Sequence, residues 1–280
     1  MSKPKIYVVC GPTATGKSDH AVELAIKVNG EIISADSRQV YRGMDIGSGK
    51  ITEEEMKGVP HHMLDIKNPD EDFSVEEFQR LSFEKIEDIF SRGKTPILCG
   101  GTGFYIQSIT ENIIFENIPK NQNLRDELEE KSVEELKEIL AKFPIEKGAK
   151  VDTENKRRLI RAIEIGTHMG KIACIKKGPE KYDFEFIYLD FPDEVLKERI
   201  NIRLQKRFEA GMIGEVRNLH EQGLSWKKLE DLGLEYKYIA QFLQGKISEK
   251  DLHEILKTKI WQYAKRQRTW FKRVLKKNNL

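Results

Sequence analysis

Eight residues near the start of the chain, Gly11-Pro-Thr-Ala-Thr-Gly-Lys-Ser18, match the phosphate-loop pattern G-x-x-x-x-G-K-[ST] at every fixed position. An apolar run over 6–10 precedes them and a helical pattern over 21–28 follows. A strand, a glycine loop and a helix in this order direct successive backbone N–H groups at one anion, which disfavours a chance match in a surface turn. Lys17 would reach the outer phosphate, and the Ser18 hydroxyl would ligate Mg²⁺. The segment predicts a di- or triphosphate, by default ATP or GTP, bound by Gly11, Pro12, Thr13, Ala14, Thr15, Gly16, Lys17 and Ser18.

A polar cluster, Asp36-Ser-Arg-Gln39, follows the apolar run over 31–35. In parallel α/β sheets ligands bind outside the carboxyl ends of the strands, so this cluster should share an edge with the phosphate loop. A carboxylate there can accept a proton from a nucleophile or hold Mg²⁺. A turn or helix-capping Asp is the plainer alternative. The polar neighbours of Asp36 favour a binding surface.

A third segment, Gly100-Gly-Thr-Gly103, follows the apolar run over 96–99. Glycines after a strand allow close backbone approach, and Thr102 could donate or accept one hydrogen bond near the reacting centre. Glycine turns after strands are common, so this segment is weak evidence when taken alone.

Arginines could neutralise a departing diphosphate from the side opposite the loop. Candidates are spaced four residues apart on two helical stretches, at Arg157 and Arg161 and at Arg203 and Arg207. For most arginines a solvated helix face is the alternative. The pair His61-His62 is read as turn or packing residues, because adjacent histidines do not share a helix face and no third metal ligand is suitably spaced.

The composition is that of an ordinary globular protein of 280 residues, with 34% charged and 39% hydrophobic residues. No apolar run reaches membrane-spanning length, and the first residues lead directly into a strand, so we expect neither a membrane segment nor a signal peptide. The three cysteines are far apart in the sequence. We therefore expect reduced thiols and a cytoplasmic protein.

The net charge of +2 conceals an asymmetry between the end of the chain and the rest. Residues 256–280 contain nine Lys or Arg and no Asp or Glu, which leaves about −7 on the remainder. The cations are mixed with aromatic residues, which suits phosphates and unstacked bases of a nucleic acid. An amphipathic helix with a solvated basic face explains the pattern equally well.

The order of apolar runs predicts an α/β fold with a P-loop NTPase-like parallel sheet and flanking helices. Strands are expected over 6–10, 31–35, 96–99 and 184–189, and a helix from a Ser74 cap to about Phe90. The block over 117–182 has no convincing strand, with helical stretches over 123–140 and 152–168. We expect a core over 1–116 and 183–280, with basic C-terminal helices, and a small all-helical insertion between the two core segments.

Taken together, the motifs resemble those of the tRNA dimethylallyltransferase, or tRNA isopentenyltransferase, family. The resemblance covers nearly the whole chain in family order. It rests on the phosphate loop and on Ser34–Gly47, Pro60–Ile66, Gly100–Tyr105, Arg158–Glu164 and Ala264–Phe271. The second segment and the Ala-Lys-Arg-Gln segment are specific, whereas the phosphate loop alone is not. The chain departs from the family at Gly233–Tyr238, where many members have Gly-Tyr-Lys-Glu.

The resemblance implies transfer of a dimethylallyl group from dimethylallyl diphosphate to the exocyclic amine of adenine 37, beside the tRNA anticodon. By resemblance, Asp36 is the general base, Thr13 lies near the bridging oxygen of the diphosphate, Arg207 binds the diphosphate and Thr102 belongs to the catalytic set. The implied cofactor is Mg²⁺ on Ser18, and we expect a monomer. Implied contacts to the anticodon stem-loop of tRNA are Asp36, Ser37, Arg38, Gln39, Thr102, Arg125, Arg157, Arg158, Leu159, Ile160 and Arg161.

Three other functions share part of this pattern. An adenylate dimethylallyltransferase would use the same loop and Asp36 but needs no RNA-binding surface. A small-molecule kinase would bind a nucleoside triphosphate and close an arginine-bearing lid over it. The insertion could serve as such a lid. An RNA-binding protein with a vestigial loop is disfavoured by the intact Gly16-Lys17-Ser18.

Overall fold

A computed structural model of the chain describes residues 3–277. The chain folds into two compact units, one formed by Met1–Glu111 with Glu180–Leu280 and the other by Asn112–Pro179. The inserted unit therefore begins at Asn112 and ends at Pro179, a few residues before the expected bounds of 117 and 182. None of the helices within 3–277 is long and apolar enough to cross a membrane.

The first unit is built on a five-stranded sheet in the order β3-β2-β4-β1-β7, and every pairing is parallel. Its strands are β1 (Lys5–Cys10), β2 (Gly30–Ser34), β3 (His61–His62), β4 (Thr95–Gly100) and β7 (Asp183–Tyr188). This confirms the predicted α/β class and four of its strands to within a residue or so. The short edge strand β3 was not expected, because two residues carry no alternating pattern.

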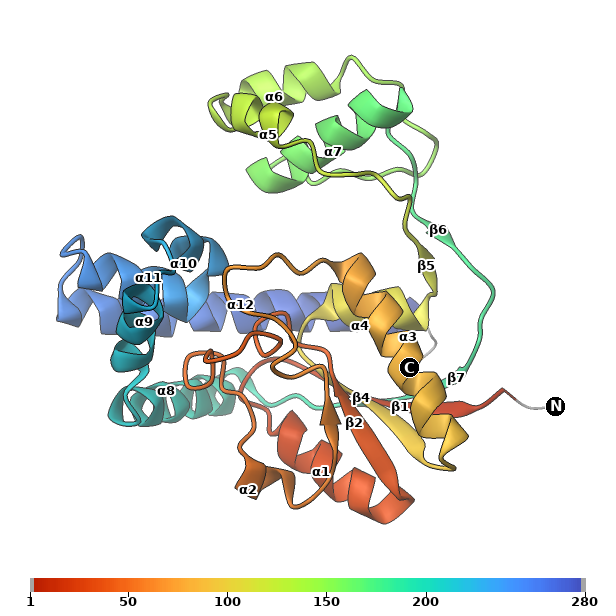
Figure 1. The fold of residues 1–280 in the computed structure, drawn as a ribbon, viewed down its shortest axis with the longest axis vertical. Coiled ribbons are helices and arrows are strands. Elements are labelled where there is room, and N and C mark those ends of the chain that lie inside the picture. The colour runs from red at the N-terminus through yellow and green to blue at the C-terminus, as the bar shows by residue number, and fades with distance from the viewer. Residues whose placement is uncertain (1–2, 278–280) are drawn as a thin grey trace. The chain divides into compact units, whose positions relative to one another are not determined.

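Helices cover both faces of this sheet because successive strand residues point to opposite sides. On one face, Val9, Ile32 and Ile97 pack against α1 (Lys17–Val28). On the other, Val8 and Leu98 belong to a core shared with three further helices, and Figure 1 shows α1 and α3 on opposite sides of the sheet. These three are α3 (Val75–Ser91), α4 (Gly103–Thr110) and α12 (Glu249–Lys277). Ser74 caps α3 by accepting the Glu77 N–H, as expected.

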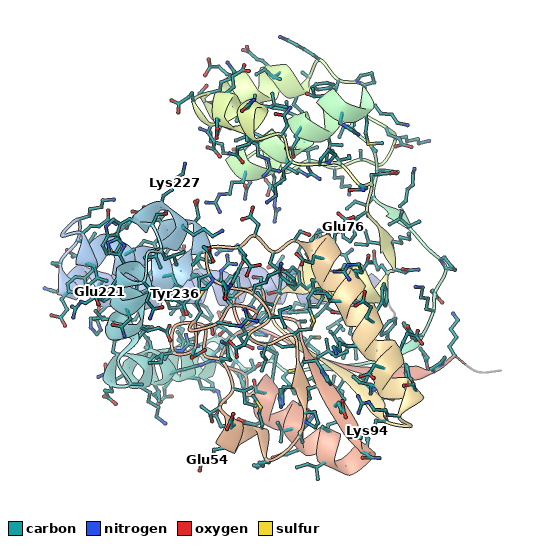
Figure 2. The ribbon with its side chains drawn as sticks, in the orientation of Figure 1. Glu54, Glu76, Lys94, Glu221, Lys227 and Tyr236 are labelled. Atoms are coloured by element: carbon teal, nitrogen blue, oxygen red, sulfur yellow. The ribbon has the colours of Figure 1, made fainter. Side chains whose placement is uncertain are left out.

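A helical layer beside the sheet forms a third apolar cluster. It contains α8 (Asp193–Glu209), α9 (Met212–Glu221), α10 (Trp226–Leu232), α11 (Leu234–Leu243) and the first half of α12. Tyr236 of α11, labelled in Figure 2, is 1% exposed there. The same cluster includes Ala14, Val40 and Met44. The helical layer therefore supports the loops that follow β1 and β2; α2 (Glu53–Met56) lies farther along the second of these connections.

The inserted unit packs three helices around Leu128, Leu136, Leu159 and Ile163. They are α5 (Gln122–Glu129), α6 (Val133–Leu140) and α7 (Lys156–Met169). The single helical stretch expected over 123–140 was wrong, because Ser132 caps a new helix with a capping box. The expectation of no strand over 117–182 was also wrong: β6 (Lys176–Lys177) lies there and pairs antiparallel with β5 (Ile113–Ile114), where the chain enters and leaves the unit.

Candidate active site

The phosphate loop forms the turn that its glycines predict. Gly11 and Gly16 have φ values of 149° and 79°, and a Cβ on Gly11 would collide with the Leu189 carbonyl. Helix α1 starts at Lys17 with Gly16 as its N-cap, so no side chain caps it. The first N–H groups of α1 are therefore open to an anion, and the helix dipole favours one there.

Lys17 folds back over this loop. Its Nζ donates to the Pro12 carbonyl at 2.6 Å, and Thr15 Oγ1 donates to the same oxygen at 2.9 Å. Burial chiefly lowers the pKa of Lys17 to about 8, and the nearby Arg203 cation acts in the same direction. A bound polyanion would reverse that shift, because it favours the charged ammonium. An anion bound at the loop can therefore replace the Pro12 carbonyl as the partner of the Lys17 ammonium.

Asp36 and Thr102 come together at the carboxyl ends of β2 and β4. Thr102 Oγ1 accepts the Ser37 N–H at 3.1 Å, and Thr102 N–H donates to the Ala35 carbonyl at 3.2 Å. Asp36 Oδ1 accepts the backbone N–H of Arg38 at 2.8 Å. Asp36 is thus a turn residue, as its plainer interpretation expected. Within 3–277 its second oxygen, Oδ2, has no hydrogen-bond partner, so the carboxylate can also act as a base.

Helix α8 presents three arginines on one face to the loops that follow β1 and β2. Arg199 Nε donates to the Ala14 carbonyl at 2.7 Å. Arg203 donates to Thr13 Oγ1 at 3.4 Å and to the Gly49 carbonyl at 3.2 Å. Burial, and then the cation of Arg207, lower the pKa of Arg203 to about 10. Among the described residues Arg203 has no carboxylate within ion-pair distance.

Arg207 is engaged differently from Arg203. It forms an ion pair with Glu235 at 2.8 Å and donates to the Gly47 carbonyl at 3.3 Å. Glu235 is 8% exposed. The residue that resemblance linked to the diphosphate is therefore already neutralised by a buried carboxylate, whereas Arg203 contacts the loop without one. Replacing Glu235 by a neutral residue would leave Arg207 as a buried charge without a partner.

Two further residues that sequence reasoning missed hold the loop over 45–49. Glu215 accepts the N–H groups of Ile46 and Gly47 at 2.6 and 3.0 Å. Tyr236 donates its hydroxyl to the same carboxylate at 2.9 Å. Both Glu235 and Tyr236 lie in the segment that departs from the family pattern. Nothing in their local sequence signals these partners, which are distant along the chain.

The remaining polar residues after β2 also support the loops. Arg38 Nε donates to the Leu232 carbonyl at 2.6 Å, and Gln39 Nε2 donates to the Gly49 carbonyl at 3.2 Å. The Ser37 N–H donates a hydrogen bond to Thr102 Oγ1. The segment that was expected to contact RNA thus also joins β2 to the helical layer.

The C-terminal helix α12 contributes an inner face to this site, which favours a structural role for part of the basic tail. Gln267 lies between the phosphate loop and the loop after β4, and Arg268 bonds Asp190 at 2.9 Å. Lys265, Arg266, Lys272 and Arg273 are exposed on the outer face. The helix is therefore amphipathic, and the nucleic-acid interpretation concerns only its exposed cations; residues 278–280 lie outside the described chain.

In the inserted unit, two of the arginines expected to contact tRNA bind one buried carboxylate. Arg125 binds Glu164 with two hydrogen bonds at 2.9 and 2.7 Å, and Arg161 pairs with the same group. Burial alone would raise the pKa of Glu164. Hydrogen bonds from Arg125, the Asn121 N–H and Arg161 outweigh burial and lower it to about 2.

Other residues of helix α7 divide between core and surface. Leu159 and Ile160 are 0% and 4% exposed, so their side chains pack in the core of the unit. Arg157 and Arg158 are exposed, and Arg158 pairs with Asp152 at 2.8 Å. Of the residues expected on this helix to bind RNA, these two present the most exposed cations.

The donor set fits Mg²⁺ bound together with a phosphate ligand. No group of three His, Cys, Asp or Glu able to hold a metal occurs within 3–277. The Ser18 hydroxyl is exposed and has no hydrogen-bond partner there. Mg²⁺ usually takes one or two protein oxygens and completes its shell with phosphate oxygens and water. His61 and His62 are bonded to the Val59 carbonyl and to Glu31, which agrees with packing roles.

Comparison with known proteins gives one consistent family. A family model described as IPP transferase matches residues 39–274. The tRNA dimethylallyltransferase 2 of Treponema denticola is 44% identical over 279 residues, covering 98% of this chain and 93% of that protein. The crystal structure of a tRNA delta(2)-isopentenylpyrophosphate transferase from Staphylococcus epidermidis matches with a TM-score of 0.71 at 40% identity, over 96% and 90% of the two chains. A eukaryotic dimethylallyltransferase acting on tRNA matches with a TM-score of 0.76 at 28% identity, over 95% of this chain and 69% of that one. The chain therefore belongs to the IPP transferase family.

Proposed function

We propose that the chain transfers a dimethylallyl group from dimethylallyl diphosphate to the exocyclic amine of adenine 37 in tRNA, giving N6-dimethylallyladenosine and diphosphate. One observation carries the proposal: the phosphate loop after β1 and the Asp36–Thr102 pair after β2 and β4 share one edge of the sheet. A leaving-group site and a base at one edge suit transfer of carbon between two substrates. The names of its relatives support the choice of substrates.

The phosphate loop would hold the diphosphate as a leaving group. The bond between the allylic carbon and its oxygen breaks more easily when negative charge on that oxygen is neutralised. Lys17, the open N–H groups of α1 and Arg203 supply that charge from the chain itself. Mg²⁺ on Ser18 would add Lewis-acid stabilisation of the same diphosphate.

Arg203 takes the diphosphate-binding role in this proposal, with Arg207 supporting it. Arg203 contacts Thr13 and has no carboxylate partner among the described residues, whereas Arg207 pairs with Glu235. An arginine that burial has partly desolvated gains most from an incoming anion. Arg207 would then hold the loop over 47–49 in place through its bond to Gly47.

Asp36 would take the proton that the adenine amine loses as the new carbon–nitrogen bond forms. The amine is a poor nucleophile, so the base must be positioned beside it. The turn that engages Oδ1 fixes the carboxylate and leaves Oδ2 for the proton. Adenine must leave its stack to reach this edge, as base-modifying enzymes require. Thr102 accepts a hydrogen bond from the Ser37 N–H and so fixes the segment that carries Asp36.

The tRNA would be bound through phosphates by exposed cations of both units. The outer face of α12 offers Lys265, Arg266, Lys272 and Arg273, and α7 offers Arg157 and Arg158. Phosphate contacts of this kind position a nucleic acid and carry no sequence information. In this proposal Arg125 of α5 supports that surface by holding helix α7 through Glu164, with which Arg161 of α7 also pairs.

One assay tests the function directly. The protein is incubated with Mg²⁺, labelled dimethylallyl diphosphate and either unmodified tRNA with adenine at position 37 or AMP. Label in tRNA is the expected result, and the same tRNA with guanine at that position is the control. Label only in AMP would replace the proposal with an adenylate dimethylallyltransferase. ATP turnover with a small acceptor and no label transfer would replace it with a kinase.

A further inference from the structure

The side-chain amide of Gln267 lies between two loops of the site. The residue is 6% exposed, and both of its polar atoms bond to backbone groups. Its Oε1 accepts the Thr13 N–H at 2.8 Å, and its Nε2 donates to the Gly101 carbonyl at 2.9 Å. A single side chain from α12 therefore connects the phosphate loop with the loop after β4.

The sheet does not make this connection itself. Strands β1 and β4 pair up to Cys10 and Gly100, where their ladder ends. Gln267 bonds to residues just beyond this end of the ladder. Gly101 leaves room for it, because a Cβ there would collide with Gln267 Nε2. The amide suits the position, since it offers an acceptor and a donor on one planar group.

The two connected loops hold the groups that must be placed relative to one another. Thr13 is the residue whose hydroxyl Arg203 contacts. Gly101 precedes Thr102, which accepts the Ser37 N–H next to Asp36. The span of the Gln267 amide thus contributes to the separation between the diphosphate site and the base.

We propose that Gln267 is a positioning residue that sets the spacing between the leaving-group site and Asp36, an inference that rests on the function proposed above. Gln267 turns the Thr13 N–H towards α12, so this donor is not available to the diphosphate. Thr13 therefore serves the diphosphate through its hydroxyl alone. Because Gln267 touches neither substrate, its loss changes the geometry of transfer more than the binding of either substrate.

The first test replaces the amide and keeps its length. Gln267→Met removes both hydrogen bonds with a flexible apolar side chain of similar size. We expect kcat for label transfer to fall about 100-fold, because a misplacement of about 1 Å costs about that much. KM for dimethylallyl diphosphate and for tRNA should change less than threefold. Gln262→Met on the same helix is the control, since its amide has no hydrogen bond among the described residues.

The second test moves the amide without changing it, in case the first variant does not fold. Gly101→Ala adds the Cβ that would displace Gln267 Nε2, in a backbone conformation open to alanine. It should reproduce the loss of kcat. Gly214→Ala on α9 is the matched control, because an added Cβ there meets nothing within 4 Å.

A third readout does not depend on activity. Hydrogen exchange of the Thr13 amide should accelerate at least tenfold in Gln267→Met and stay unchanged in Gln262→Met. If wild-type protein transfers no label, the proposed function fails, whereas the exchange result still reports on the bond. If wild-type protein transfers label, unchanged kcat in both Gln267→Met and Gly101→Ala overturns the positioning role. A loss confined to KM for tRNA also overturns it and makes Gln267 an RNA contact.

Discussion

The two compact units differ in how they pair their partly buried arginines. In the inserted unit, Arg125 and Arg161 both bond directly to Glu164. In the α/β unit, Arg207 bonds Glu235, but the partners of Arg203 within residues 3–277 are the Thr13 hydroxyl and the Gly49 carbonyl. The first cluster is complete without a ligand. The second lacks one negative charge and lies beside a loop built for phosphate.

The difference shows how a structural arginine can be distinguished from a ligand-binding one. A buried charge is costly unless it is paired, so a fold keeps an unpaired cation where something else supplies the partner. Arg203 meets that description, and Arg125 and Arg161 do not. Changes to Arg203 should therefore reduce activity with little loss of folding, and changes to Glu164 should do the reverse.

The largest effect is expected at Asp36. Asp36→Asn keeps an oxygen for the turn to the Arg38 N–H but removes the base. Label transfer to tRNA should fall by about 10³-fold, within the range of general-base contributions. Diphosphate binding, measured by calorimetry, should stay within about threefold of wild type. Loss of diphosphate binding would instead make Asp36 a metal or structural residue, as one of its sequence-based alternatives allowed.

The next effect contrasts Arg203 with Arg207. Arg203→Gln should weaken the binding of inorganic diphosphate about 100-fold and change the melting temperature little, because its bonds are to neutral oxygens. Arg207→Gln leaves Glu235 buried without its cation and should mainly lower the free energy of unfolding, by about 3 kcal/mol. The two variants are compared by calorimetry and by chemical denaturation. A reversed pattern would restore Arg207 as the diphosphate ligand.

The complete cluster of the inserted unit is tested through Glu164. Glu164→Gln should destabilise that unit by about 3 kcal/mol, since two arginines lose a buried carboxylate. Diphosphate binding by the α/β unit should persist.

The pH dependence of the stability of this cluster follows from the carboxyl group of Glu164. Its pKa in the folded protein, about 2, lies below the ordinary value. The stabilisation is thus fully present above the ordinary pKa of a glutamate and is lost as the pH falls towards 2. Denaturation of wild type and variant across that range checks the sign, and equal acid sensitivity of the two proteins would count against it.

The smallest effect concerns the outer face of α12. Lys272→Glu combined with Arg273→Glu should weaken tRNA binding about tenfold and reduce the slope of log K against log salt by about two. Arg157→Glu combined with Arg158→Glu makes the same test on α7. Filter binding at several salt concentrations measures both. An unchanged slope in either variant would make that face a solvated surface.

Sequence patterns predicted most of the α/β unit, because the relevant signals are local. The phosphate loop needs glycines at fixed spacing, and buried strands are short apolar runs. The same reasoning failed at β3, which is too short for a pattern, and between α5 and α6, where the cap at Ser132 was overlooked. Asp36 and Thr102 were expected near the phosphate loop because parallel strands place their carboxyl ends along one edge, and they lie at that edge.

The sequence alone determined the phosphate loop, the strand and helix that flank it and the presence of many cations, since these depend on residues close together in the chain. Only the tertiary structure decided which cations are already paired. Arg207 meets Glu235 across 28 positions, and Gln267 meets Thr13 across 254. A hydrogen bond depends on where two groups lie in space, and no local spacing specifies the position of a partner so distant. The distinction between Arg203 and Arg207, and the role of Gln267, are therefore properties of the fold.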